Sequence, residues 1–210
     1  MVVCTGNICR SPVAEQLLLS RFALSGLAVE IMSAGTRATE GEPMTKHAKA
    51  LAGRYGASPM SHSARLLTSD LIAAADLVLT ATREHRRAVV SFFPRSAMYA
   101  YTLTQLARLI DELPVSEPDH PEYPRLPNAS TYRFLQILDE IAESRGTAAP
   151  PLQPEVDDIP DPYRRSQSVY DRVGALINAA MTVIATHLVE HVTALSEQKY
   201  PQAEPGFSAV

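Results

Sequence analysis

A cysteine and an arginine separated by five residues stand out near the start of the sequence. The segment reads Cys4-Thr5-Gly6-Asn7-Ile8-Cys9-Arg10-Ser11-Pro12. Five intervening residues allow a loop to circle a tetrahedral anion, so that Cys4 and Arg10 would face the same group. A thiolate is a strong nucleophile, and a guanidinium binds phosphate oxygens through two parallel hydrogen bonds. The spacing therefore predicts a loop that binds phosphate and transfers a phosphoryl group to Cys4.

The residues around this pair favour that interpretation over a chance match. A free cysteine is usually a small buried hydrophobe, so Cys-x5-Arg alone would be a weak signal. Here Gly6 and Asn7 can adopt left-handed backbone conformations, which a loop with inward N–H groups requires. We expect Pro12 at the first helical position of a following helix, whose positive end points into the loop.

The sequence resembles the low-molecular-weight protein tyrosine phosphatases. The resemblance rests on Cys4 to Ser11, on a distant Asp161-Pro162-Tyr163, and on the segments 32–36 and 60–65 in the same order. Residues 158–166 look most like the bacterial, exopolysaccharide-linked branch. The resemblance covers about residues 1–112 and 156–190 and leaves 113–155 outside.

The resemblance implies a mechanism through a cysteinyl-phosphate, with Cys4 as nucleophile and Arg10 holding the phosphate. A carboxylic acid must protonate the leaving group and later activate water. From the residues alone, Asp157, Asp158 and Asp161 are all candidates. The resemblance selects Asp161, and we expect Asp157 and Asp158 to be a solvated acidic stretch.

Further roles follow from the resemblance. Ser11 would donate a hydrogen bond to Cys4, while Ser33 and His62 would hold Asn7. The expected substrate contacts come from the loop and from an aromatic wall, namely Thr5, Gly6, Ile8, Cys9 and Tyr163. We expect the remaining histidines to be structural, namely His47, His85, His120, His187 and His191.

Two relatives of this scaffold and one other class of protein provide alternatives. Arginine phosphatases carry a threonine where this chain has Ile8, and an apolar residue there favours a phenyl ring over a guanidinium. Arsenate reductases need additional shuttle cysteines, and none follows Cys9. A phosphate-binding module without catalysis is disfavoured because Cys4, Arg10 and Asp161 are all present. The first choice is a phosphotyrosine-protein phosphatase.

Bulk composition limits the partners. The 210 residues carry a net charge of −4, which disfavours nucleic acid or an anionic membrane surface as a partner. No apolar run predicts a membrane span or a secretory signal, and two cysteines on one loop suit the reducing cytoplasm. We expect no metal and no cofactor. The expected partner is a tyrosine-phosphorylated protein, for which the resemblance suggests a bacterial tyrosine kinase.

The elements that must position the loop alternate between strand and helix. Apolar runs predict strands at 2–4, 29–33, 76–80 and 97–101, and periodic segments predict helices at 12–26, 43–55, 69–75, 84–93, 103–113 and 166–190. This order predicts an α/β fold: one doubly wound domain with a four-stranded parallel sheet and the phosphate loop after strand one. The domain would span 1–199, with a proline-rich insertion at 113–155 around a helix at 130–145 and a disordered tail at 200–210.

Overall fold

The computed structural model describes residues 1–25, 29–57, 61–113 and 129–197. Its centre is a parallel sheet of four strands in the order β2-β1-β3-β4, which confirms the predicted α/β class. The strands are short, at β1 Val2–Cys4, β2 Ser33–Gly35, β3 Val78–Thr80 and β4 Ala100–Thr102. Cys4 pairs with Gly35, so the nucleophile lies at the carboxyl edge of the sheet, where α/β sites form.

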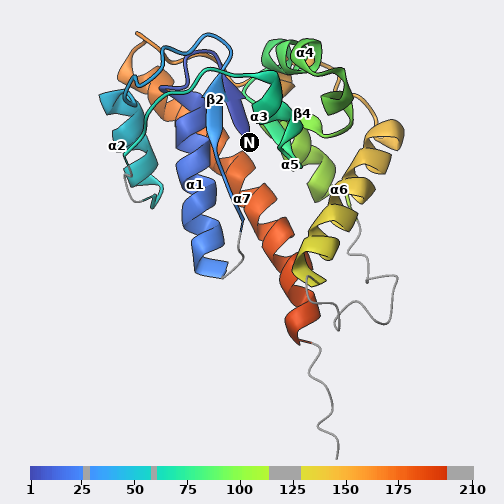
Figure 1. The fold of residues 1–210 in the computed structure, drawn as a ribbon. Helices are drawn as coiled ribbons and strands as arrows, with labels where there is room; N and C mark the ends of the chain where they lie inside the picture. Colours follow the sequence, from blue (N-terminus) through green and yellow to red (C-terminus); the bar gives the residue numbers. More distant parts are fainter. Residues whose placement is uncertain (26–28, 58–60, 114–128, 198–210) are drawn as a thin grey trace, which may run out of the picture.

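Helices cover both faces of the sheet (Figure 1). They are α1 Arg10–Ser25, α2 Lys46–Arg54, α3 Ser69–Ala73, α4 Arg83–Phe92, α5 Leu103–Asp111, α6 Ala129–Thr147 and α7 Gln167–Glu197. Val2, Leu79 and Tyr101 belong to a large core with α1, α5 and α7, while Val3 and Val78 belong to a smaller one with α3 and α4. Successive strand residues thus serve opposite faces, which explains why the strands read as uniformly apolar.

Several element boundaries differ from the sequence prediction. The second strand begins at Ser33, where the prediction had ended it, and the fourth begins at Ala100 because Pro94–Met98 forms a 3-10 turn. Helix α3 is capped by Thr68, whose side chain accepts from the Leu71 N–H, and not by Ser69 as predicted. Strand ends and caps depend on hydrogen-bond partners that lie elsewhere in the sequence, so local patterns place them poorly.

Helix α6 exists as predicted, but only part of its expected apolar face is buried. The sequence pattern predicts a face made of Tyr132, Leu135, Leu138, Ile141 and Ala142. Ile141 is buried as expected, whereas Tyr132 and Leu135 are exposed, and Arg133 and Ile137 are buried against α5 and α7 instead. At its end, Arg145 donates to the carbonyls of Ala97 (2.7 Å) and Ala100 (3.0 Å). Ala97 lies in the preceding 3-10 turn, whereas Ala100 belongs to the edge strand β4, so the second bond occupies a carbonyl group that would otherwise be open to another strand. The proline-rich arm at 114–128 lies outside the described residues, as does the tail at 200–210.

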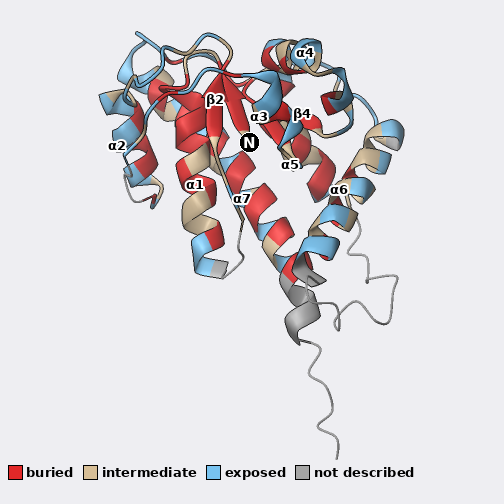
Figure 2. Cartoon of the chain, viewed as in Figure 1, coloured by how far each residue is buried: buried red, intermediate tan, exposed pale blue. Residues whose placement is uncertain are grey.

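Helix α7 runs through the middle of the molecule and packs against α1, α5 and α6 (Figures 1 and 2). Residues Gln167–Val192 are long and apolar enough to cross a membrane, which the sequence analysis did not anticipate. A core helix can have the same length and composition. The sequence pattern predicts a core-facing stripe on this helix, made of Val169, Val173, Leu176, Ile177, Ala180, Ile184 and Leu188. Val173, Ile177, Ile184 and Leu188 are buried as expected, whereas Leu176 is exposed.

Candidate active site

The loop between β1 and α1 forms a cradle of backbone donors. The N–H groups of Thr5 through Cys9 donate to no described backbone carbonyl. Asn7 has φ 55°, so the left-handed conformation expected of it is present, whereas Gly6 does not have a positive φ. Helix α1 begins at Arg10, and Pro12 is therefore its third residue rather than its first. It still lies in the first turn, where its missing N–H costs no helical bond.

Gly35 brings the end of β2 against this loop. A Cβ atom on Gly35 would lie 2.5 Å from the Thr5 carbonyl oxygen and 2.9 Å from the Asn7 nitrogen. Beyond it, the N–H of Thr36 donates to the Cys4 carbonyl (2.9 Å) and that of Arg37 to the Thr5 carbonyl (2.9 Å). The absence of a side chain at Gly35 therefore allows the two segments to pair at this distance.

A chain of hydrogen bonds fixes the proton beside the nucleophile. The Asn7 Nδ2 group donates to Ser11 Oγ (2.9 Å) and to Ser33 Oγ (2.7 Å). Ser11 Oγ lies 3.0 Å from Cys4 Sγ. Because Ser11 accepts from an amide that can only donate, its own hydroxyl proton is free to point at the sulfur. Ser11 is thus placed to stabilise a Cys4 thiolate.

Glu15 and His62 complete this network. Ser33 Oγ donates to Glu15 Oε2 (2.6 Å), and Nε2 of His62 donates to the Asn7 carbonyl (2.6 Å). The other ring nitrogen of His62 lies 3.6 Å from Glu15 Oε2. The geometry matches the predicted support of Asn7 by Ser33 and His62. Glu15 was not predicted, although it lies one helical turn after Ser11 and could have been proposed from that spacing.

The two terminal nitrogens of Arg10 have hydrogen-bond or ion-pair partners, whereas its Nε does not. Its Nη1 donates to the Ile159 carbonyl (3.0 Å), and its Nη2 contacts Thr5 Oγ1 (3.3 Å) and Asp161 Oδ2 (3.2 Å). The side chain is 4% exposed, and its Nε has no described partner. An unpaired buried N–H is costly, so an acceptor such as a phosphate oxygen would be stabilised there. Asp161, half-exposed, is within reach of the same position.

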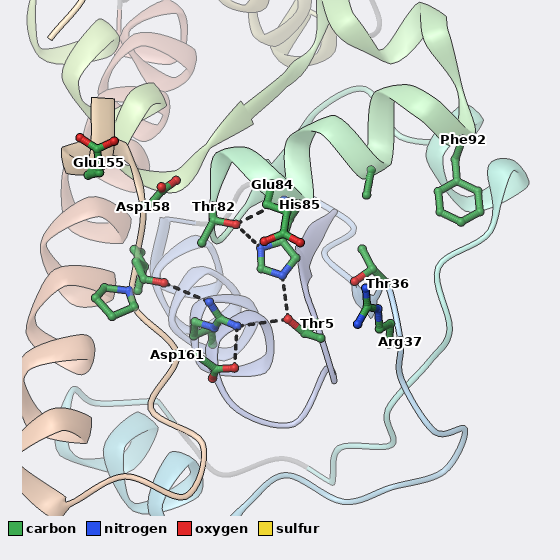
Figure 3. Close-up of a pocket in the computed structure, with 14 residues that line it drawn as sticks. Thr5, Thr36, Arg37, Thr82, Glu84, His85, Phe92, Glu155, Asp158 and Asp161 are labelled. Atoms are coloured by element: carbon green, nitrogen blue, oxygen red, sulfur yellow. Dashed lines mark hydrogen bonds and ion pairs between the residues drawn. The ribbon is translucent and has the colours of Figure 1, made fainter. Parts of the chain in front are cut away.

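His85 is a site residue that the sequence analysis assigned to structure alone (Figure 3). Its Nε2 lies 2.8 Å from Thr5 Oγ1, and its Nδ1 lies 2.6 Å from Thr82 Oγ1. Burial and the neighbouring Arg10 guanidinium lower the pKa of His85 to about 4. The ring is therefore a neutral bridge at physiological pH. The sequence could have indicated this role, because His85 follows the third strand closely and so lies at the same edge of the sheet as Cys4.

Asp157 and Asp158 are not a solvated stretch, which corrects the prediction. Asp157 is buried, 3.4 Å from Arg108. Asp158 accepts from the Arg83 backbone N–H at 2.7 Å and from its guanidinium at 2.9 Å. Burial raises the pKa of Asp158, but the hydrogen bonds from Arg83 outweigh it and the net shift is downward. Both carboxylates therefore anchor the segment that carries Asp161.

Cys9 and Tyr163 do not line the cavity that lies beside Arg10. Cys9 Sγ contacts Thr45 Oγ1 (3.4 Å) and Tyr170 Oη (3.5 Å), and burial raises the pKa of its thiol. Tyr163 faces Arg164 through a cation–π contact and does not line the cavity described next. The predicted substrate contacts of Gly6, Ile8, Cys9 and Tyr163 stay predictions.

A cavity of about 690 Å³ opens beside Arg10 and Asp161. Its walls come from the phosphate loop, the segment after β2, helix α4 and the residues before Asp161, and include Thr5, His85 and Asp158 (Figure 3). Within the described ranges, no group of three or more His, Cys, Asp or Glu residues could hold a metal ion. Arg10 and Asp161 line this cavity, whereas the buried Cys4 does not. The arrangement can hold a phosphoryl group against the Arg10 guanidinium with the Asp161 carboxyl group within reach.

Comparison with known proteins agrees with this chemistry. The family described as low molecular weight phosphotyrosine protein phosphatase matches residues 1–156, and this match runs through the whole of segment 113–155, which the resemblance had left outside. A protein-arginine-phosphatase of Bacillus subtilis is 40% identical over 104 residues, which cover 49% of this chain and 68% of the relative. The low molecular weight protein-tyrosine-phosphatase Etp of Escherichia coli K12 is 28% identical over 180 residues, with 86% and 87% covered.

Solved structures also show the same fold. The YwlE arginine phosphatase from Geobacillus stearothermophilus superposes with a TM-score of 0.60 at 26% identity, covering 95% of this chain and 96% of that one. Phosphatases of tyrosine and of arginine are therefore both among the similar proteins.

Proposed function

Because the chain belongs to the low molecular weight phosphotyrosine protein phosphatase family, we propose that it hydrolyses phosphotyrosine in proteins through a phosphorylated Cys4. The observation that carries the proposal is the unpaired Nε of buried Arg10 beside a loop whose N–H groups are free. Together these donors can surround the oxygens of one phosphoryl group. Oriented donors stabilise charge that develops at those oxygens during transfer.

In the first step, Cys4 Sγ attacks phosphorus and the bond between phosphorus and the tyrosine oxygen breaks. Ser11, held by Asn7, donates to the sulfur before the attack. Asp161 gives its proton to the departing phenolate. Its contact with Arg10 at 3.2 Å must loosen when phosphate oxygens occupy the guanidinium.

In the second step, a water molecule attacks the cysteinyl-phosphate. The Asp161 carboxylate removes a proton from that water, the bond between phosphorus and sulfur breaks, and Cys4 leaves as a thiolate. One carboxyl group thus serves both half-reactions, as acid and then as base.

Arginine phosphatase activity is the second candidate, and the 40% identical Bacillus subtilis relative is the observation that favours it. Ile8, which is buried within the loop, argues against arginine phosphatase activity. An apolar branched side chain leaves the N–H groups of a phosphoguanidine without partners, whereas it can pack against a phenyl ring. Unpaired polar groups cost about 1–3 kcal/mol each, which is enough for roughly tenfold discrimination.

The physiological partner and location belong to the same proposal. A bacterial tyrosine kinase that carries phosphotyrosine is the substrate we favour, on the ground of the resemblance of residues 158–166 to one bacterial branch. A cytoplasmic location is supported by Cys4 and Cys9, which are both free thiols.

The test is a comparison of kcat/KM for matched phosphotyrosine, phosphoarginine and phosphoserine peptides. We expect phosphotyrosine to be preferred over phosphoarginine by roughly tenfold or more and phosphoserine, whose side chain is too short to reach the loop, to be nearly inert. Ile8→Thr should narrow the difference between the first two, and Cys4→Ser should abolish turnover of all three. A wild-type preference for phosphoarginine would promote the second candidate.

A further inference from the structure

The cavity extends well beyond the groups that phosphoryl transfer requires. Its volume of about 690 Å³ lies in the range of roughly 300–1,000 Å³ that is typical of sites for drug-sized ligands. Besides Arg10 and Asp161, its lining includes Thr36 and Arg37, which follow β2, and Ala88 and Phe92 on helix α4. In Figure 3, Phe92 and Arg37 lie on the side of the cavity away from Glu155 and Asp158.

The two sides of this cavity differ in charge. Arg10 and Arg37 are the two cationic residues among those that line it, whereas Glu84, Glu155, Asp158 and Asp161 are acidic. Arg10 is occupied by Thr5, Ile159 and Asp161. Arg37 is exposed, and its side chain makes no ion pair with any residue of the described ranges. The side beside Phe92 thus carries an available positive charge.

We propose that Arg37 and Phe92 bind the peptide segment next to the phosphotyrosine and select an acidic side chain there. The inference rests on the proposed function, since the substrate must be a protein for a flanking residue to exist. Phe92, 51% exposed, supplies an aromatic surface for the peptide and Arg37 supplies the complementary charge. The continuity of this surface with the wall that contains Arg10 makes one bound peptide the natural occupant of both.

The size of the expected preference for an acidic peptide follows from the solvent exposure of Arg37. An ion pair at a solvent-exposed rim changes affinity only modestly, which corresponds to about a two- to fivefold preference at low salt. Screening should reduce the preference as ionic strength rises from roughly 0.05 to 0.5 M. A selectivity of this kind acts mainly on KM, because the charge pair lies away from the reacting atoms.

The experiment uses three phosphotyrosine peptides that differ at two positions only. One has Glu two residues before the phosphotyrosine, one has Glu two residues after it, and the third has Gln at both places. We expect wild type to show a higher kcat/KM for at least one Glu peptide than for the Gln peptide. Arg37→Gln should bring this ratio to one, whereas Arg87→Gln, an exposed arginine of α4 that does not line the cavity, should preserve it.

The ratio of two peptides on one enzyme cancels any general loss of activity in a variant. Equal kcat/KM values for all three peptides with wild type, or a preference that persists in Arg37→Gln, would overturn the inference and leave the phosphatase assignment intact. If none of the three peptides were hydrolysed, the proposed function would fail and this inference with it.

Discussion

His85 connects the phosphate loop to helix α4 through hydrogen bonds at both ring nitrogens. On one side it contacts Thr82, which caps α4, and on the other Thr5, which contacts Arg10 Nη2. With its pKa lowered to about 4 by burial and by Arg10, the ring adds no second positive charge to the site. We therefore assign it the part of a positioning residue that orients Thr5 and, through it, Arg10.

Replacing His85 by Ala should weaken phosphate binding. Loss of the ring removes one hydrogen bond from Thr5 and one from Thr82, so that Thr5 keeps only its contact with Arg10. A lost hydrogen bond of this kind corresponds to roughly tenfold in affinity. We expect the inhibition constant for inorganic phosphate and the KM for p-nitrophenyl phosphate to rise together, with partial recovery in His85→Gln. His187→Ala, remote from the site, controls for general destabilisation. An unchanged phosphate inhibition constant in His85→Ala would show that the bridge does not position Arg10.

Strand β2 and the segment after it support the phosphate loop through close contacts between backbone atoms. Strand β2 continues past Gly35 as a segment whose N–H groups donate to the carbonyls of Cys4 and Thr5. The loop thereby keeps its own N–H groups free for an anion, because its carbonyl groups are engaged from behind. Such an arrangement depends on the backbone of β2 more than on any side chain.

Gly35→Ala should disrupt the site as well as the fold. The new Cβ would meet backbone atoms of Thr5 and Asn7, which cannot move independently of the loop. We expect a loss of about 1–3 kcal/mol in the free energy of unfolding, together with a large fall in kcat/KM. Gly53→Ala in helix α2 is the matched control, since nothing lies within 4 Å of its Cβ position. Thermal melting measures the loss of stability, and kinetics with p-nitrophenyl phosphate measure the fall in kcat/KM. A Gly35→Ala variant with the stability and kcat/KM of the wild type would contradict the packing argument.

The order of the elements could be predicted from the sequence because each strand is a short apolar run followed by a helical pattern. Motif spacing predicts Cys4 and Arg10, whereas Asp161 was selected from three carboxylates only by the family resemblance. Glu15 and His85 were missed, since their roles come from contacts with Ser33 and Thr5 across separate elements. The buried face of α6 was wrong at Tyr132 and Leu135, because a buried arginine, Arg133, interrupts its apolar pattern.

At the scale of the whole molecule, the buried His85 and the partly buried His187 link stability to pH. Burial lowers the pKa of His187 to about 4, helped by His191 and Arg133, and His85 has a similar value. In the unfolded chain both titrate near 6.5. Between pH 6.5 and 4 the unfolded state therefore binds more protons than the folded state, and the free energy of unfolding falls as the pH falls.

The melting temperature should accordingly decrease as the pH is lowered from about 6.5 to 4. Above about pH 7.5 both histidines are neutral in both states and contribute no slope. The double variant His85→Gln and His187→Gln should have a flatter profile over that interval. Differential scanning calorimetry at a series of pH values measures the slope, and a melting temperature of the wild type that stays constant from pH 6.5 to 4.5 would contradict the assignment.

Direct detection of the phosphorylated nucleophile tests the central claim. Asp161→Asn should slow the attack of water, and p-nitrophenyl phosphate has a leaving group that can depart without a proton from Asp161. The covalent intermediate should therefore accumulate when this variant is mixed with p-nitrophenyl phosphate and quenched with acid. Mass spectrometry should then find the mass of one phosphoryl group on the peptide that contains Cys4, and none after the same treatment of Cys4→Ala. Hydrolysis of phosphotyrosine that persists in Cys4→Ala, or a phosphoryl group found on another residue, would contradict the mechanism.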